Sequence, residues 1–96
     1  MEQTEFIKII LEILLPISDI STNANKEYVG LYKDGIIFGK ILGRKVLLLN
    51  HVNKFTEVEN TLITRLLKLE KAQSDVDMFL LQATKSWWLA RGKMNF

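Results

Sequence analysis

A two-layer α+β domain is the fold that this sequence predicts, with one helix before a three-stranded antiparallel meander and two helices after it. The meander is indicated by three short apolar segments within residues 27–50, which are separated by Asp34-Gly35 and Gly43-Arg44. Both dipeptides are typical of two-residue hairpin turns, because glycine readily adopts the positive φ that such turns require. Apolar residues at helical spacing indicate the flanking helices. A chain of 96 residues is long enough for one domain with a single core.

The composition bounds the class of protein. Apolar residues make up 48% of the chain and charged residues 25%, which is typical of a folded globular protein rather than a disordered one. The formal net charge of +2 is too small to indicate nucleic acid or an anionic membrane by itself. The chain has no cysteine, so disulfides, thiolate nucleophiles and cysteine-ligated metals are excluded, and a reducing cytoplasm is expected.

The first helix is expected within the strongly apolar segment 4–15, which ends before Pro16. Glu5, Lys8 and Glu12 form a narrow polar stripe, and the remaining apolar arc is wider than that of an ordinary surface helix. The helix is therefore covered on two sides by its own chain, which we favour, or partly covered by a second molecule. A membrane span would need roughly 20 apolar residues, so a core helix is predicted here.

Residues 16–26 are rich in Ser, Thr, Asn and Asp, and this composition predicts a loop. The three strands are expected over 27–33, 36–42 and 45–50, joined by a type I′ turn and then a type II′ turn. The third strand is apolar on both faces, so we expect it to be covered on both sides.

A second helix is predicted between residues 55 and 71, because polar and apolar side chains separate onto opposite sides of a helical wheel. Thr56 and Glu59 have the spacing of a capping box at its start. The last helix should begin near Ser74 or Asp75 and end near Gly92 as a C-cap. Its expected core face comprises Val76, Phe79, Leu80, Ala83, Trp87 and Ala90.

No group of residues indicates catalysis, a metal site or a bound cofactor, and a non-enzymatic protein is predicted. His51 is the only histidine, and its place after a strand predicts an ordinary loop residue. The carboxylates have ordinary positions as helix caps or on solvated faces. Gly30 and Gly39 lie within strands, where glycine is typical of close packing or a bulge and does not build a phosphate loop.

A candidate protein interface lies on the last helix, where Leu81 and Trp88 are two turns apart with Lys85 between them and Met78 nearby. This strip points away from the expected core face, and two adjacent tryptophans cannot both enter one core from one helix. Trp88 is therefore either packed by the preceding helix or a partly exposed interface anchor. The predicted partner is an unidentified protein or a second copy of the chain, bound through this strip or through the first helix.

Direct binding of nucleic acid is the alternative function. Lys40, Arg44 and Lys45 surround the second hairpin turn and form a basic edge that could contact phosphates. No recognition motif accompanies them, and acidic residues nearly balance the charge. A solvated basic edge that discourages pairing between strands of different molecules is the interpretation we favour.

The segment VGLYKDGIIFG (29–39), with LLPI (14–17) before it and VLLL (46–49) after it, resembles the N-terminal domain of the TfoX/Sxy family of bacterial competence regulators. The resemblance covers residues 6–50, and 75–92 more loosely. It implies that residues 1–96 form one such domain, in a cytoplasmic bacterial protein related to a transcriptional co-regulator. The family carries a further hairpin before its last helix, whereas the sequence of this chain predicts a helix there. The family also has a second, C-terminal domain, for which this chain has no room.

Overall fold

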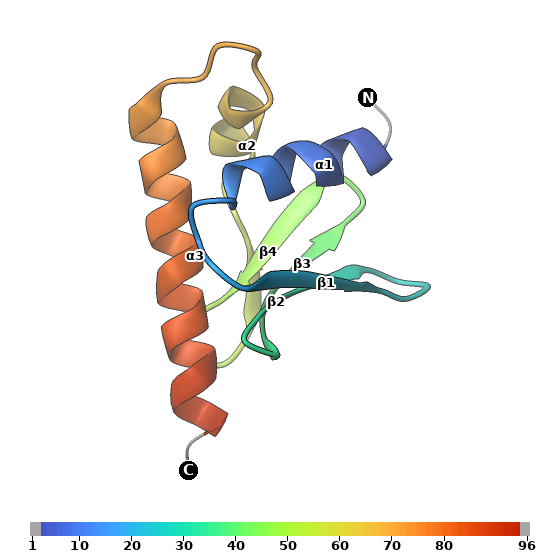
Figure 1. The fold of residues 1–96 in the computed structure, drawn as a ribbon, viewed down its shortest axis with the longest axis vertical. Coiled ribbons are helices and arrows are strands. Elements are labelled where there is room, and N and C mark those ends of the chain that lie inside the picture. Colours follow the sequence, from blue (N-terminus) through green and yellow to red (C-terminus); the bar gives the residue numbers. More distant parts are fainter. Residues whose placement is uncertain (1–2, 95–96) are drawn as a thin grey trace.

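The computed structural model describes residues 3–94 as one helix, a five-stranded antiparallel sheet and two further helices (Figure 1). The elements are α1 (Gln3–Ile13), β1 (Ile20–Ala24), β2 (Val29–Lys33), β3 (Ile36–Leu42), β4 (Lys45–Leu49), β5 (Phe55–Glu57), α2 (Asn60–Leu66) and α3 (Gln73–Met94). The strands are ordered β1-β2-β3-β4-β5, so each pairs with its neighbour in the chain. The predicted two-layer α+β class is confirmed.

The central meander and its turns lie where the glycines predicted them. Asp34 and Gly35 have φ values of 52° and 77°, and positive φ at both central positions is the signature of a type I′ turn. Gly43 has a φ of 62°, whereas Arg44 does not share the positive φ, as a type II′ turn requires. The two turns place β2, β3 and β4 side by side in the sheet.

The predicted loop over 16–26 was wrong in part, because β1 forms an outer strand within it. Its backbone pairs with β2, and Thr22 lies opposite Leu31. Ile20 is half-buried and the rest of β1 is exposed, so the strand lacks the apolar alternation by which a sequence reveals a strand. Backbone hydrogen bonds to one neighbour hold it in place.

The predicted helix over 55–71 was also wrong at both ends. Residues 55–57 form β5 against β4, and α2 is confined to Asn60–Leu66. Thr56 does not cap a helix, because its hydroxyl donates to the Leu48 carbonyl oxygen at 3.3 Å. Glu59 occupies the N-cap position without a side-chain hydrogen bond. Pairing with β4 therefore prevails over the local capping signal.

The last helix is longer than predicted. It begins at Gln73 and continues to Met94, so Gly92 lies inside the helix and does not act as a C-cap. Gly92 also lacks the positive φ that a terminating glycine adopts. Phe79, Ala83 and Ala90 are buried as predicted, and Val76, Leu80 and Trp87 pack against the core from its margin.

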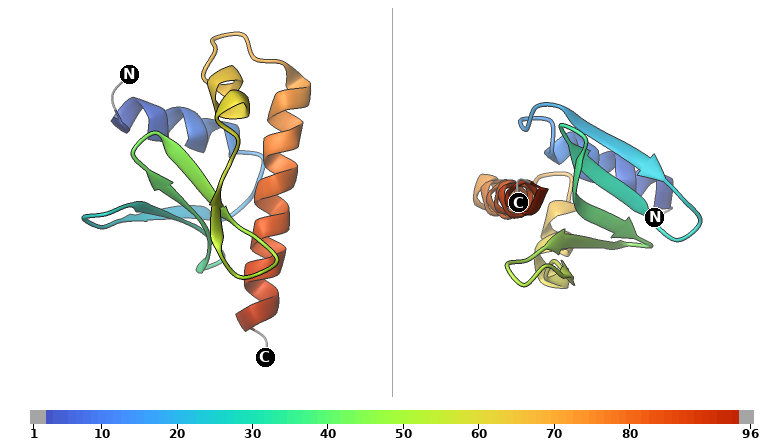
Figure 2. Two further views of the ribbon diagram at one scale, coloured as in Figure 1. Left: turned by 180° about the vertical axis from the view of Figure 1, so that it is seen from behind. Right: turned by 90° about the horizontal axis from the view of Figure 1, so that it is seen from below.

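The core lies between the helices and one face of the sheet (Figures 1 and 2). From α1 it receives Phe6, Ile10 and Ile13, and Leu14 follows from the turn after that helix. From the sheet it receives Leu31, Phe38, Ile41, Val46, Leu48 and Leu49, among others. The polar stripe of α1 is exposed, and most of its apolar arc is buried or half-buried against the same chain. The favoured interpretation of α1, covering mostly by its own chain, agrees with this packing.

The second face of the sheet has no helix over it, as the view from behind in Figure 2 shows. Leu47 points to this face and is half-buried, whereas Val46 and Leu48 on the other face are buried. The expectation that the third predicted strand is covered on both sides is met at Leu49, which shares the face of Leu47 and is buried, and only in part at Leu47. A cavity of about 320 Å³ opens beside Tyr32, Ile37 and Phe55 on this part of the surface.

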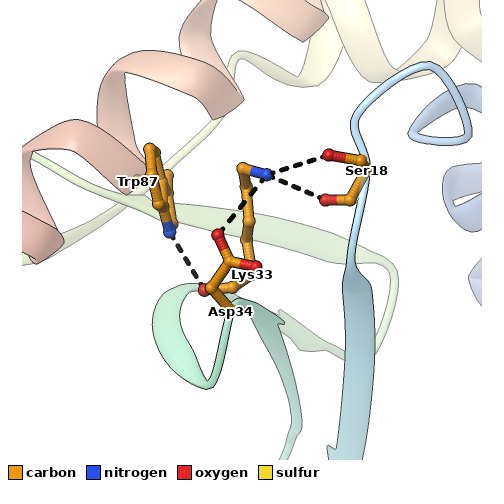
Figure 3. A network of polar contacts seen from close by, with 4 residues as sticks. All are labelled: Ser18, Lys33, Asp34 and Trp87. Atoms are coloured by element: carbon orange, nitrogen blue, oxygen red, sulfur yellow. Dashed lines mark hydrogen bonds and ion pairs between the residues drawn. The ribbon is translucent and has the colours of Figure 1, made fainter.

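A polar network fixes α3 against the sheet (Figure 3). The Trp87 indole N–H donates to the Lys33 carbonyl oxygen at 3.0 Å, and the Lys33 ammonium lies 4.9 Å from the Trp87 ring centroid. The same ammonium donates to the carbonyl oxygen of Ser18 at 2.9 Å and to its hydroxyl at 3.3 Å, and it lies 3.8 Å from the Asp34 carboxylate. The network thus joins α3, the end of β2 and the α1–β1 connection.

Replacing Trp87 with phenylalanine is expected to lower the free energy of unfolding by about 1–2 kcal/mol, because the part-buried Lys33 carbonyl oxygen loses its indole donor. Urea denaturation followed by far-UV circular dichroism measures this change. The matched control is Trp88→Phe on the exposed side of the same helix, for which a change below about 0.5 kcal/mol is expected. Equal effects of the two substitutions would contradict a structural role for the indole hydrogen bond.

Candidate interaction surface on the last helix

The rotation of α3 about its own axis is fixed by what it buries. Phe79, Ala83 and Ala90 face the core, and Ser86 is buried beside them. The Ser86 hydroxyl donates to the Leu49 carbonyl oxygen of β4 at 2.8 Å, which satisfies a polar group that would otherwise be costly to bury. Because these residues all point inward, the opposite face of α3 is turned to solvent.

The four residues predicted as an interface lie together on that outer face. Met78 is 49% exposed, Leu81 is 58% exposed and Trp88 is 56% exposed, and Lys85 is exposed between them. The two alternatives for Trp88 are thereby resolved, because α2 does not bury it and it is a surface residue. Isolated apolar side chains are common on protein surfaces, but three large ones on one helix face form a patch of the kind found at interfaces.

Two neighbours hold the indole of Trp88. Its ring packs edge-to-face on Trp87 with 5.1 Å between the ring centroids and 68° between the planes. The Arg91 guanidinium lies 5.0 Å from the Trp88 centroid and 5.4 Å from the Trp87 centroid. Since Trp87 is itself hydrogen-bonded to the sheet, these contacts restrict the positions open to the Trp88 ring and so lower the side-chain entropy that binding would cost.

Charges are distributed unevenly along α3. Its beginning is acidic: the Asp75 carboxylate pairs with Arg65 of α2 at 3.1 Å, and the exposed Asp77 accepts a hydrogen bond from Gln73 at 2.9 Å. Lys85 and Arg91 follow in the second half, and both are exposed. The outer face therefore changes from negative to positive along the helix, with the apolar side chains between.

The basic edge predicted as the alternative site does not form a free basic patch. The Lys40 ammonium lies between two aromatic rings on the uncovered sheet face, 4.3 Å from the Tyr28 centroid and 4.4 Å from the Phe55 centroid. Lys45 pairs with Glu57 at 3.6 Å, and Arg44, which is exposed at the turn, also has a partner. Each of the three cations is thus engaged within the domain, and no observation favours nucleic-acid binding here.

The Tyr28–Lys40–Phe55 cluster was not predicted. Its three residues come from the segment before β2, from β3 and from β5, which the sheet brings together. The signal that could have revealed it is the strand period, because Tyr28 and Lys40 lie on the face opposite the buried Leu31 and Ile41. Phe55 could not be added to that face while residues 55–71 were interpreted as a helix.

Two other kinds of site, a metal centre and a membrane-spanning helix, are absent from the described part of the chain. Within residues 3–94, no three His, Asp or Glu side chains come together in a group that could hold a metal ion. His51 is exposed in the β4–β5 turn, at the side of an open hollow of about 360 Å³ between that turn and α3. In the same range no helix has both the length and the apolar character needed to cross a membrane.

No protein-family model, no curated protein and no solved structure matches this chain.

Proposed function

We propose that this protein is a small non-enzymatic regulatory or adaptor domain that binds another protein chain through the outer face of α3. The observation that carries the proposal is the exposure of Met78, Leu81 and Trp88, each about half accessible, on one face of one rigid helix. Burying these side chains against a partner would remove apolar surface from water, and each Å² removed stabilises the complex by about 25 cal/mol. No other described element exposes three large apolar side chains on one face.

The composition of the strip supports a protein partner rather than a small molecule or a nucleic acid. Tryptophan and arginine are the residues most enriched among those that dominate binding energy in protein interfaces, and here Trp88 and Arg91 are adjacent in space. The strip lies along a helix, and an exposed apolar helix face is a surface that a second helix can cover. A small ligand would need a concave apolar site, whereas the apolar side chains Met78, Leu81 and Trp88 stand exposed on the outside of a helix.

The biological setting that we propose follows the resemblance of residues 29–39 to the TfoX/Sxy N-terminal domain. On this basis the domain acts in the cytoplasm of a bacterium and contributes to the regulation of transcription or competence by contacting other proteins. The absence of cysteine from the chain is consistent with a reducing compartment.

Site-specific photo-crosslinking tests the proposal in the cells that produce the protein. A photoreactive amino acid at position 85 is expected to form a protein adduct whose crosslinked peptides are identified by mass spectrometry. The same group at position 68, which is exposed beyond the end of α2, serves as the matched control. Adding Leu81→Asp to the chain labelled at position 85 should abolish the adduct, because a charge then enters the apolar strip. Absence of any adduct above the position 68 control would refute the proposed function.

A further inference from the structure

We infer that the partner of the α3 strip is a second copy of this chain, whose α3 crosses the first one antiparallel about a twofold axis. The inference rests on the proposed function and adds to it the identity of the partner and the alignment of the two helices. Three observations carry it: the spacing of the residues on the outer face, the position of Lys85 within that spacing, and the opposite charges of Asp77 and Arg91.

The outer face of α3 has the spacing of a helix–helix seam. Counting along it, alternate steps of four and three residues connect Ser74, Met78, Leu81, Lys85, Trp88 and Gly92. This is the a/d pattern by which two helices interdigitate over their length. The residues that point to the core belong to other positions of the same repeat, so the seam is available to a second helix.

Lys85 determines the direction of the partner helix. In a parallel pair each seam residue faces its own copy, and Lys85 would face the partner's Lys85 in the middle of the seam, where like charges repel. In an antiparallel pair with the axis level with Ala83, Lys85 faces the partner's Leu81. Its alkyl stem can then pack on the leucine while the ammonium extends to solvent.

The same alignment places the largest apolar side chains against each other. With the axis level with Ala83, Met78 faces the partner's Trp88, and by symmetry Trp88 faces the partner's Met78. Contact between a thioether and an aromatic ring is favourable beyond its apolar area. The twofold axis repeats this contact, so the half-exposed Met78 and Trp88 of both chains would be covered in one dimer.

The residues that flank the seam are complementary in charge at this alignment. Asp77 lies beside Met78 and Arg91 lies beyond Trp88, so each Asp77 lies opposite the partner's Arg91 at the margin. The Arg91 guanidinium lies close to both the Trp87 and the Trp88 rings, at the margin of the seam. Asp75 is paired with Arg65 within its own chain. Among the described residues, the exposed Asp77 bonds only to its helix neighbour Gln73, through Oδ1, so its second carboxylate oxygen can accept a bond from a partner. Antiparallel alignment also places the positive end of each helix dipole beside the negative end of the other, which is a favourable interaction.

The first helix and the sheet edges are less suited than α3 to contact a second copy of the chain. On α1 and the turn after it, Leu15 is the one large apolar side chain in the described range that is mostly exposed, while Ile7 and Leu11 are half-buried. At the sheet edges, β1 is polar and β5 has three residues, which limits pairing between sheets. Compared with α1 and the sheet edges, the outer face of α3 is therefore the better surface for a symmetric partner.

Exchanging the two flanking charges tests the alignment. Asp77→Arg and Arg91→Asp should each weaken the dimer about 10-fold in sedimentation equilibrium, because each single variant creates two like-charge contacts in place of two ion pairs. Mixing the two single variants should restore association, since both ion pairs then form between unlike chains. The control Glu70→Arg has the same change in charge outside the seam and should leave the dissociation constant unchanged. Circular dichroism of each variant checks that the fold is retained.

Cysteine trapping provides an independent measurement, because the native chain has no cysteine. A chain with both Met78→Cys and Trp88→Cys should give a covalent dimer on mild oxidation, and peptide mapping should find position 78 joined to position 88. Bonds that join position 88 to position 88 would indicate a parallel pair and overturn the inference. A chain that stays monomeric at roughly millimolar concentration, well above the dissociation constant of even a small interface, would overturn it as well. If position 85 nevertheless crosslinks to a different protein in cells, the proposed function stands and the second copy alone is rejected.

Discussion

Replacing Phe79 with alanine is expected to lower the free energy of unfolding by about 3–5 kcal/mol, the cost of removing a large aromatic side chain from a packed core. Phe79 is completely inaccessible to solvent. It is also the one large, fully buried side chain that the described part of α3 contributes, because Ala83 and Ala90 are small and Trp87 lies at the margin. Alanine would therefore leave a cavity between the helix and the sheet.

The loss is a large fraction of the 5–15 kcal/mol that is typical of a whole domain. Urea denaturation measures this loss of stability. Tryptophan fluorescence reports the docking of α3 through Trp87, and circular dichroism reports the global fold. Phe79→Leu is the matched control, for which roughly 1 kcal/mol is expected because most of the volume is kept. A loss below about 1 kcal/mol for alanine would show that α3 does not close the core.

The second large effect is expected from Gly39→Ala, which should destabilise the domain by about 1–3 kcal/mol through overpacking. A Cβ atom at position 39 would lie 2.9 Å from Leu48 Cδ2, 3.2 Å from Leu31 Cδ1 and 3.0 Å from the Leu47 carbonyl oxygen. The carbonyl oxygen belongs to the neighbouring strand β4 and cannot move without disturbing the ladder. The methyl group therefore has no direction in which to relax.

Gly30→Ala is the matched control for this prediction. The three atoms nearest to its Cβ would all belong to the Tyr32 side chain, with Cε1 the closest at 2.7 Å. That half-buried side chain lies on the uncovered face of the sheet, where it can swing aside. We expect a smaller loss of stability than for Gly39→Ala, and thermal unfolding of the two variants side by side makes the comparison. An equal or larger loss for Gly30→Ala would contradict the assignment of the tight contact to position 39.

The parts of the fold that follow from local chemistry could be predicted from the sequence. The two hairpin turns are set by glycines that adopt positive φ, so the meander was predicted together with its turn types. The strands at the two sides of the meander could not be predicted. β1 is polar and exposed, and β5 is three residues long beside a false capping signal, so both depend on a neighbouring strand that the local sequence does not show.

The same distinction applies to the candidate site. Met78, Leu81, Lys85 and Trp88 were grouped by helical spacing, and the helix places them on one face. Whether Trp88 is buried by α2 depends on where α2 lies, which helical spacing cannot tell. The Tyr28–Lys40–Phe55 cluster was missed for a similar reason, because its members meet only through the register of several strands.

The order of the strands determines which contacts in this domain close short loops of the chain and which close long ones. Since each strand pairs with its neighbour in the chain, every pairing in the sheet closes only a short connection. The loss of conformational freedom at each of these closures is small, because it rises with the length of the loop. The long closure is the one that joins Phe6 of α1 and Phe79 of α3 in a single core. The sheet can therefore be assembled from local contacts, whereas the packing of α1 and α3 in one core needs a contact between residues that are distant in the sequence.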